Sequence, residues 1–141
     1  MLLALSMVAA ACSKKSATPT GGSSQSGPST MTIGSDTATN KGTQDLSGKS
    51  TFALKLDNDG GKFYFEPTVL RGTPGQQVTL TLTNVGATLH NFSLPDQSVD
   101  QDVAHGASGS VQVTFPQSGF LEFFCKYHRS LGMVGELTVG S

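Results

Sequence analysis

The sequence predicts an all-β protein, folded as an antiparallel Greek-key β-sandwich of about seven to eight strands. Short segments that alternate apolar and polar residues recur through the last two-thirds of the chain, and Gly- or Pro-containing turn signals separate them. Such spacing is typical of a β-sandwich. The 17 Gly and the low aromatic content of 7% also favour a β-rich domain joined to a segment that builds no core. An immunoglobulin-like sandwich without a metal fits the same pattern.

The first strands of the domain follow from alternation and turn chemistry. Alternating apolar residues in 52–56, an Asp/Asn/Gly turn signal at 57–61 and the aromatic run 63–65 predict a β-hairpin. Pro67 then marks an edge position or a bulge. Residues 78–84 alternate Val or Leu with Thr, so one face should lie in the core and the other in water.

The second half of the domain is expected to add four further strands, the last two of which form a pair joined by a loop. These strands are predicted at 90–94, 111–115, 121–125 and 135–139. The intervening segment 96–109 has no clear period and is interpreted as a long surface crossover, with His105 as a surface loop residue. Its acidic side chains are most simply solvated, and a calcium or partner site is the minor alternative; they are Asp96, Asp100 and Asp102.

The N-terminal third is expected to target and tether the domain. Residues 1–11 form an apolar run of signal-peptide length that ends in small residues, so we expect a lipoprotein-like signal with Cys12 as the lipidated residue. An ordinary cleaved signal and a merely apolar N-terminus are the alternatives. Residues 12–50 are rich in Ser, Thr and Gly and predict a flexible linker, which leaves 51–141 as the folded domain. The location is therefore expected to be extracytoplasmic: periplasmic, or lipid-anchored to a bacterial cell membrane.

A metal-binding motif lies near the C-terminus. Cys125, His128 and Met133 combine a thiolate, an imidazole and a thioether within nine residues, a set that suits copper; with a second His it is the blue-copper set. His90, at the start of a strand, is a better candidate for that second His than His105 in its loop. Zinc is the rival metal, but it has little use for Met.

The residues of this motif resemble those of the cupredoxins, with a plastocyanin-like spacing in the loop. The resemblance covers roughly 51–139 and rests on His90-Asn91-Phe92, on the run Gly119 to Cys125, and on Cys-x2-His-x4-Met. It implies one copper, with His90, Cys125 and His128 as equatorial ligands and Met133 as the axial ligand. It also implies that Asn91 braces the ligand loop and hydrogen-bonds near the sulfur.

The function expected from this site is single-electron transfer by Cu(I)/Cu(II) cycling, without conversion of a substrate. An oxidase needs further His-rich copper centres, and the chain has only three His. The alternatives are a periplasmic copper-binding or copper-delivery protein, and a lipoprotein domain that functions by docking alone. The net charge of −1 gives no basis for nucleic-acid binding.

The expected partners are redox proteins, either a cytochrome, an oxidase or a reductase, that meet a monomeric domain. In the family that the motif resembles, the ring edge of the residue corresponding to His128 reaches the surface. An apolar docking patch is therefore expected around it, with two basic residues beside it and an acidic partner opposite. The patch would comprise Leu131, Gly132 and Val134, and the basic residues are Lys126 and Arg129. The membrane would be reached only through the lipid anchor.

Overall fold

The computed structural model describes residues 29–140, which contain twelve strands and two single-turn 3-10 segments. The strands are β1 (Thr30–Ile33), β2 (Asp36–Thr39), β3 (Thr43–Asp45), β4 (Thr51–Asp59), β5 (Lys62–Glu66), β6 (Val69–Gly72), β7 (Gln77–Asn84), β8 (His90–Leu94), β9 (Val99–Val103), β10 (Ser108–Thr114), β11 (Phe120–Phe124) and β12 (Val134–Val139). The 3-10 segments are η1 (Pro95–Gln97) and η2 (Arg129–Leu131). Within the described residues, no helix has the length and hydropathy that crossing a bilayer requires.

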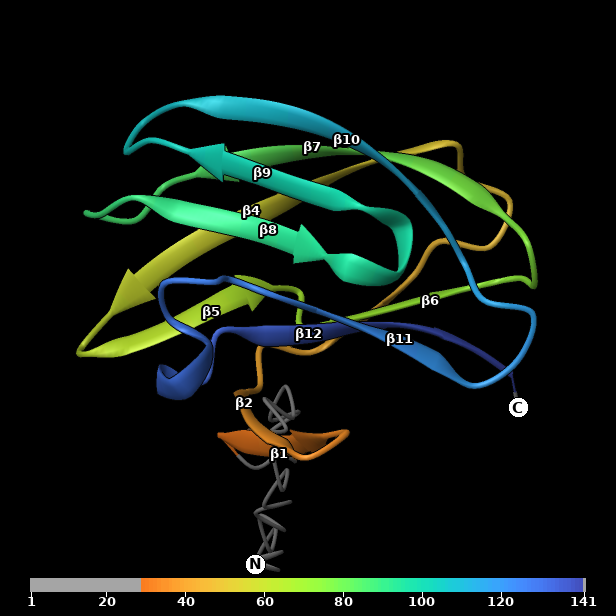
Figure 1. Cartoon of the computed structure of the whole chain (residues 1–141), viewed down its shortest axis with the longest axis horizontal. Coiled ribbons are helices and arrows are strands. Elements are labelled where there is room, and N and C mark those ends of the chain that lie inside the picture. The colour runs from red at the N-terminus through yellow and green to blue at the C-terminus, as the bar shows by residue number, and fades with distance from the viewer. Residues whose placement is uncertain (1–28, 141) are drawn as a thin grey trace, which may run out of the picture.

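The strands form two large sheets and one small hairpin. One sheet has the order β10-β7-β4-β5, the other the order β3-β6-β12-β11-β8-β9, and β1 pairs with β2. The predicted all-β sandwich is confirmed, but residues 29–140 form twelve strands in place of seven to eight, and the sandwich is not wholly antiparallel. Three of the strand pairs are parallel, namely β4 with β7, β6 with β12, and β3 with β6. In Figure 1 the β4–β5 turn, the β7–β8 loop and the β11–β12 loop gather at the same end of the molecule.

The core lies between the two sheets and follows the alternation of the sequence. In β7 the residues Val78, Leu80 and Leu82 are buried, whereas the Thr residues between them are partly or fully exposed. Three aromatic rings pack at the centre, with centroids 4.8 to 6.0 Å apart: Phe65, Phe92 and Phe123. This burial of apolar surface is the main force that holds the sheets together.

The predicted flexible linker is wrong for residues 29–50. β1 and β2 form a hairpin, and β3 extends the six-stranded sheet by pairing with β6. Three of the four apolar side chains of this segment are buried, namely Ile33, Ala38 and Leu46, and Met31 is partly buried. A Thr- and Gly-rich composition hid the strands because their apolar contacts come from distant parts of the chain. The rest of the predicted linker (12–28), the predicted signal (1–11) and Cys12 lie outside the described residues.

The predicted surface crossover at 96–109 is also partly wrong. Residues 99–103 form β9, an edge strand that pairs antiparallel with β8, and β10 begins at residue 108. Val103 is buried and Val99 partly buried, whereas Asp100 and Asp102 on the opposite face are exposed. Short polar edge strands carry a weak hydrophobic signal, so the sequence alone does not reveal them.

Candidate metal centre

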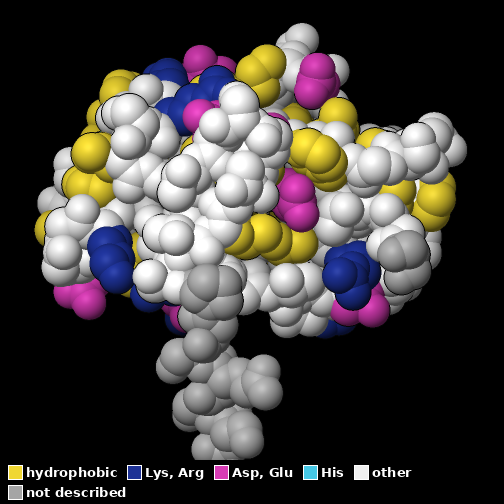
Figure 2. Space-filling model, turned by 90° about the horizontal axis from the view of Figure 1, so that it is seen from below, with side chains coloured by type: hydrophobic (Ala, Val, Ile, Leu, Met, Phe, Trp, Pro, Cys, Tyr) yellow, Lys and Arg dark blue, Asp and Glu magenta, His cyan; other side chains and the backbone are white. Residues whose placement is uncertain are grey.

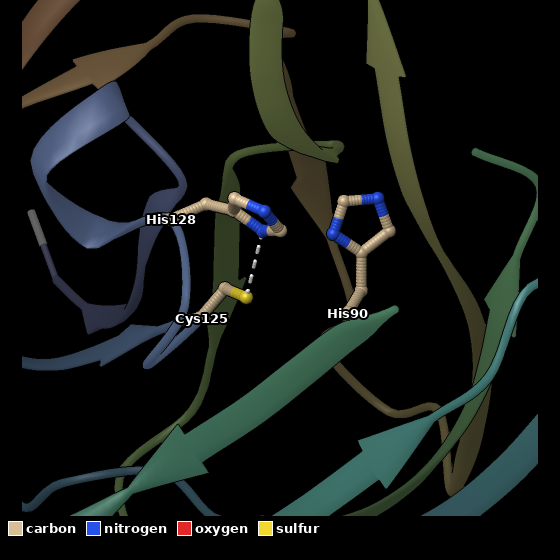
Figure 3. Close-up of side chains that lie close together, drawn as sticks. All are labelled: His90, Cys125 and His128. Atoms are coloured by element: carbon tan, nitrogen blue, oxygen red, sulfur yellow. Dashed lines mark hydrogen bonds between the residues drawn. The ribbon is translucent and has the colours of Figure 1, made fainter. Parts of the chain in front are cut away.

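His90, Cys125 and His128 converge at the end of the sandwich where the loops gather. Their ligand atoms all lie within 4.8 Å of one another (Figure 3). His90 is the first residue of β8, Cys125 directly follows β11, and His128 lies in the β11–β12 loop (residues 125–133). In residues 29–140 no other group of three or more His, Cys, Asp or Glu side chains is arranged to hold a metal ion.

The β11–β12 loop is closed by its own backbone. The Cys125 N–H donates to the Met133 carbonyl (3.0 Å), and the N–H groups of His128 and Met133 donate to the carbonyls of Cys125 (3.0 Å) and His128 (3.1 Å). Gly132 adopts a left-handed conformation (φ 92°), which glycine tolerates without the steric cost of a Cβ. These bonds set Cys125 and His128 side by side.

The Cys125 thiol is fully buried, and its Sγ lies 3.4 Å from His128 Nδ1. Burial raises its pKa, although hydrogen bonds from the backbone N–H groups of Tyr127, Asn91 and His128 oppose the rise. The metal-free side chain is therefore a thiol. A coordinated metal ion deprotonates such a thiol, and the backbone donors already point at the charge that would form.

His90 supplies the clearest sign that a ligand belongs here. It is completely buried, and its Nδ1 is the one buried side-chain nitrogen or oxygen among the described residues without a hydrogen-bond partner. Its Nε2 lies 3.2 Å from Asn58 Oδ1. Burial, followed by the nearby His128, lowers the His90 pKa to about 4, so the ring is neutral at pH 7. A neutral imidazole with an unpaired buried nitrogen, beside a thiol and a second imidazole, fits a transition-metal ion.

His128 is half-buried and lies under an aromatic ring. Phe63, from β5, stacks on its imidazole with centroids 4.1 Å apart and an angle of 15°. Burial also lowers the His128 pKa. Phe63 meets the His90 ring as well, edge to face at 6.2 Å. The two imidazoles are thus packed against one side chain.

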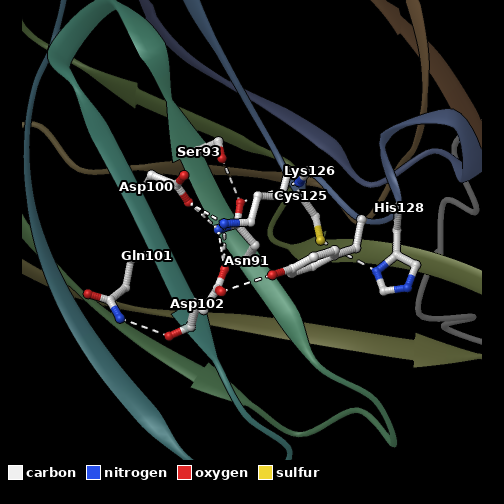
Figure 4. A network of polar contacts seen from close by, with 9 residues as sticks. Asn91, Ser93, Asp100, Gln101, Asp102, Cys125, Lys126 and His128 are labelled. Carbon is white, nitrogen blue, oxygen red and sulfur yellow. Dashed lines mark hydrogen bonds and ion pairs between the residues drawn. The ribbon is translucent and has the colours of Figure 1, made fainter.

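Met133 and Asn91 are both fully buried, and each is hydrogen-bonded to the β11–β12 loop. Met133 is fully buried between Gly132 and the start of β12, and its backbone bonds tie it to Cys125 and His128. The Asn91 Oδ1 accepts hydrogen bonds from the Lys126 N–H (3.3 Å) and from Ser93 Oγ (2.6 Å). The side chain of Asn91 therefore joins β8 to the β11–β12 loop (Figure 4).

The acidic residues of β9 are exposed, as expected, but they lie on a strand and belong to the same network. The Asn91 Nδ2 donates to Asp100 and Asp102, at 2.7 Å each. Lys126 forms ion pairs with both carboxylates (2.9 and 3.0 Å), and the Tyr127 hydroxyl donates to Asp102 (2.8 Å). Hydrogen bonds from Lys126 and Asn91 lower the pKa of both carboxyl groups.

His105, as predicted, is exposed; its Nδ1 hydrogen-bonds the Gly86 carbonyl.

The predicted docking patch is wrong for two of its three apolar residues. Leu131 is 53% exposed, but Gly132 and Val134 are buried beneath the β1–β2 hairpin. The Thr39 N–H donates to the Gly132 carbonyl at 2.9 Å, and Val134 packs with Ile33 of β1 in a small apolar cluster. Seen from below in Figure 2, the face carries interspersed acidic and basic side chains and shows no His.

Arg129 is paired rather than free. Its guanidinium contacts Asp36 of β2 (2.7 Å) and Glu122 of β11 (2.6 Å), and it also lies over the Phe124 ring. Like Lys126, it therefore faces two carboxylates. Neither basic residue of the loop offers an uncompensated charge to an acidic partner.

Sequence reasoning missed two side chains that touch the imidazoles, Asn58 and Phe63. Both lie on the β4–β5 hairpin, where they are cross-strand partners. The hairpin was predictable from its turn signal, but its contact with His90 and His128 arises from the packing of distant strands. No local signal could have indicated it.

Comparison with known proteins agrees with this geometry. The family described as "Cupredoxin-like domain" matches residues 2–139. The chain is 29% identical over 96 residues to plastocyanin A/B of Petroselinum crispum, a match that covers 61% of this chain and 97% of the plastocyanin.

Two solved structures share the fold. Dithionite-reduced auracyanin from Roseiflexus castenholzii has a TM-score of 0.51 and 18% identity, with 66% of this chain and 98% of auracyanin covered. The metal-binding domain of the Cu(I)-exporting P-type ATPase of Streptococcus pneumoniae D39 has a TM-score of 0.50 and 12% identity, with 70% and 97% covered. At these identities the likeness is one of fold alone. The family match spans nearly the whole sequence, and the chain therefore belongs to the cupredoxin-like family, whose metal is copper and whose potential type 1 site is formed here by His90, Cys125 and His128.

Proposed function

We propose that this protein is an extracytoplasmic type 1 copper protein that carries single electrons between redox partners and transforms no substrate. The observation that carries the proposal is the buried, unpaired Nδ1 of His90 beside Cys125 and His128. These three side chains are the proposed equatorial ligands, and Met133 is the proposed weak axial ligand. Copper bound there would supply a one-electron couple between Cu(I) and Cu(II).

The protein's contribution is a frame that holds its ligands still. His90 is fixed by strand β8 of the six-stranded sheet, and Cys125 and His128 are fixed by the backbone bonds of their loop. A frame that does not rearrange when the charge changes keeps electron transfer fast. Asn91 is proposed to support it by holding Lys126, the residue next to Cys125.

Electrons are proposed to pass through the half-buried edge of His128. Three exposed apolar side chains lie beside the ligands in sequence and suit a transient contact: Leu89, Tyr127 and Leu131. The cations nearest this surface, Lys126 and Arg129, are outnumbered by the four carboxylates that they contact. This balance favours a redox partner whose docking face is neutral or basic, in place of the acidic partner that the sequence suggested.

The N-terminal sequence supports an extracytoplasmic location. The apolar run of 1–11 and Cys12 are proposed to form a lipoprotein signal and lipid anchor. Cys125 is the one Cys among the described residues, and it has no disulfide partner there. An unpaired thiol in an oxidising compartment is consistent with metal ligation.

The test is the visible spectrum of the full chain carrying Cys12→Ser, so that Cys125 is the one thiol present. Addition of Cu(II) should give an intense thiolate-to-copper band that reductant bleaches. The same chain with Cys125→Ser should lack the band while keeping its β-sheet circular dichroism. A colourless protein that binds Cu(I) and passes it to an acceptor would instead establish copper delivery, which the full burial of Cys125 disfavours. Failure to bind copper would contradict both.

A further inference from the structure

The side chain of Asn58 meets the His90 ring on the side away from Cys125. Asn58 lies near the end of β4, and its Oδ1 accepts the Ala87 backbone N–H at 2.9 Å and lies 3.2 Å from His90 Nε2. Figure 3 shows one ring nitrogen of His90 turned toward His128 and Cys125 and the other turned away. The nitrogen turned away is the one that Asn58 contacts.

The hydrogen bonds determine which atom of the Asn58 amide faces the ring. A backbone N–H can only donate, so the Asn58 atom that meets the Ala87 N–H must be the oxygen. An amide oxygen can only accept, so His90 Nε2 must carry the proton of the neutral ring. The neutral imidazole has one such proton, which leaves a free lone pair on Nδ1.

That lone pair belongs to the atom that has no other partner. His90 Nδ1 is buried and unpaired, on the side of Cys125 and His128. A proton on this nitrogen would be buried without an acceptor, at a cost, and would block metal binding. The Nε2–H tautomer avoids both effects, and Asn58 is the side chain that stabilises it.

The backbone around Asn58 is shaped to allow this contact. A Cβ on Gly86 would lie 2.4 Å from Asn58 Oδ1 and 2.7 Å from His90 Nε2, so a larger residue there would separate them. Phe63, the cross-strand partner of Asn58, stacks on His128 from the same hairpin. One β-hairpin therefore holds both imidazoles, one by a hydrogen bond and the other by stacking.

We propose that Asn58 is a positioning residue that holds His90 in the Nε2–H tautomer and so presents Nδ1 to the metal. The inference rests on the proposed function for the identity of that metal, but not for the tautomer. Partners that orient a metal-binding His through its second nitrogen typically change metal affinity by about 10- to 100-fold when removed.

The test is ¹⁵N NMR of the His90 ring in the metal-free full chain, at a pH where the ring is neutral. The wild type should show a protonated Nε2 and an unprotonated Nδ1. Asn58→Asp keeps the acceptor and should keep this tautomer. Asn58→Leu has a similar shape without an acceptor, so it should populate the Nδ1–H form and weaken Cu(II) binding by about 10- to 100-fold.

A wild-type ring protonated at Nδ1 would overturn the inference, as would an Asn58→Leu variant with unchanged tautomer and Cu(II) affinity. The wild-type and Asn58→Asp spectra can still overturn the inference if Asn58→Leu does not fold, because an Nδ1–H ring in either would contradict it. If the wild type binds no copper, the proposed function fails, whereas the tautomer measurement still tests the role of Asn58.

Discussion

The two imidazoles of the site are held in opposite ways. His90 begins a strand inside the six-stranded sheet, is fully buried and is fixed by register with β9. His128 lies in a loop, is half-buried and depends on contacts from outside that loop. The difference shows that one ligand position is a property of the sheet, whereas the other must be built from separate segments.

The β1–β2 hairpin supports the loop that carries His128. Thr39 hydrogen-bonds Gly132, and Asp36 pairs with Arg129. Ile33 and Ala38 bury Val134, the first residue of β12. The loop that carries His128 therefore rests on residues about 90 positions earlier in the chain. Removing such contacts should disturb the His128 side while leaving His90 in place.

The largest expected effect is the dependence of the unfolding free energy on pH that His90 causes in the metal-free protein. Its pKa is about 4 when folded, against 6.5 ordinarily, so between these values the unfolded chain binds a proton that the folded chain does not. The contribution of His90 to the unfolding free energy should be fully present above about pH 6.5. It should fall by about 3 kcal/mol as the pH drops to 4. Urea unfolding at pH 7.5 and pH 4 measures this. His90→Gln should flatten the dependence, and an unchanged slope would contradict the assignment to His90.

Gly132→Ala should break the contact between the β11–β12 loop and the β1–β2 hairpin, on the His128 side of the site. Its φ of 92° is strained for alanine, and the added Cβ would lie 2.8 Å from Thr39 Oγ1. We expect a loss of about 2 to 3 kcal/mol of unfolding free energy. Gly119→Ala is the matched control, because its φ is 69° with nothing within 4 Å, and it should cost only about 1 kcal/mol. Equal losses in both variants would show that the contact with Thr39 contributes nothing.

Phe63→Leu should change the pKa of His128 but leave the pKa of His90 nearly unchanged. The stacked ring covers His128 at 4.1 Å, whereas it meets His90 only edge-on at 6.2 Å. We expect the His128 pKa to rise toward its ordinary value because burial is what lowers it, with little change for His90. The unfolding free energy should fall by about 1 kcal/mol. NMR titration of the metal-free protein reads both rings, and Phe63→Tyr, which keeps the ring, serves as control.

The smallest expected effect is that of Asp36→Asn, which removes one carboxylate from Arg129. The pair is partly exposed, so we expect a loss of about 0.5 kcal/mol that high salt abolishes. Lys55→Gln is the comparison, because its pair with Glu66 is longer (3.6 Å) and more exposed. A salt-independent loss for Asp36→Asn would indicate packing rather than charge as the cause.

The sequence by itself determined the fold class and the residues that meet at the site. Alternation in β7 and the turn signal between β4 and β5 identified a sandwich because burial of one strand face leaves a period of two. The spacing within 125–133 and the position of His90 at a strand start identified the ligand candidates, because few metals suit that set of donor atoms. These signals are local or chemical, so they can be read without a structure.

Only the tertiary structure decided what surrounds those residues. The Thr- and Gly-rich segment before residue 51 became a supporting hairpin because Val134 and Phe124 complete its small apolar cluster. Asn58 and Phe63 became neighbours of the imidazoles because the β4–β5 hairpin folds over them. Lys126 and Arg129 form ion pairs with carboxylates on β2, β9 and β11. All of these contacts join segments far apart in sequence, and no pattern within one segment specifies its partner in another.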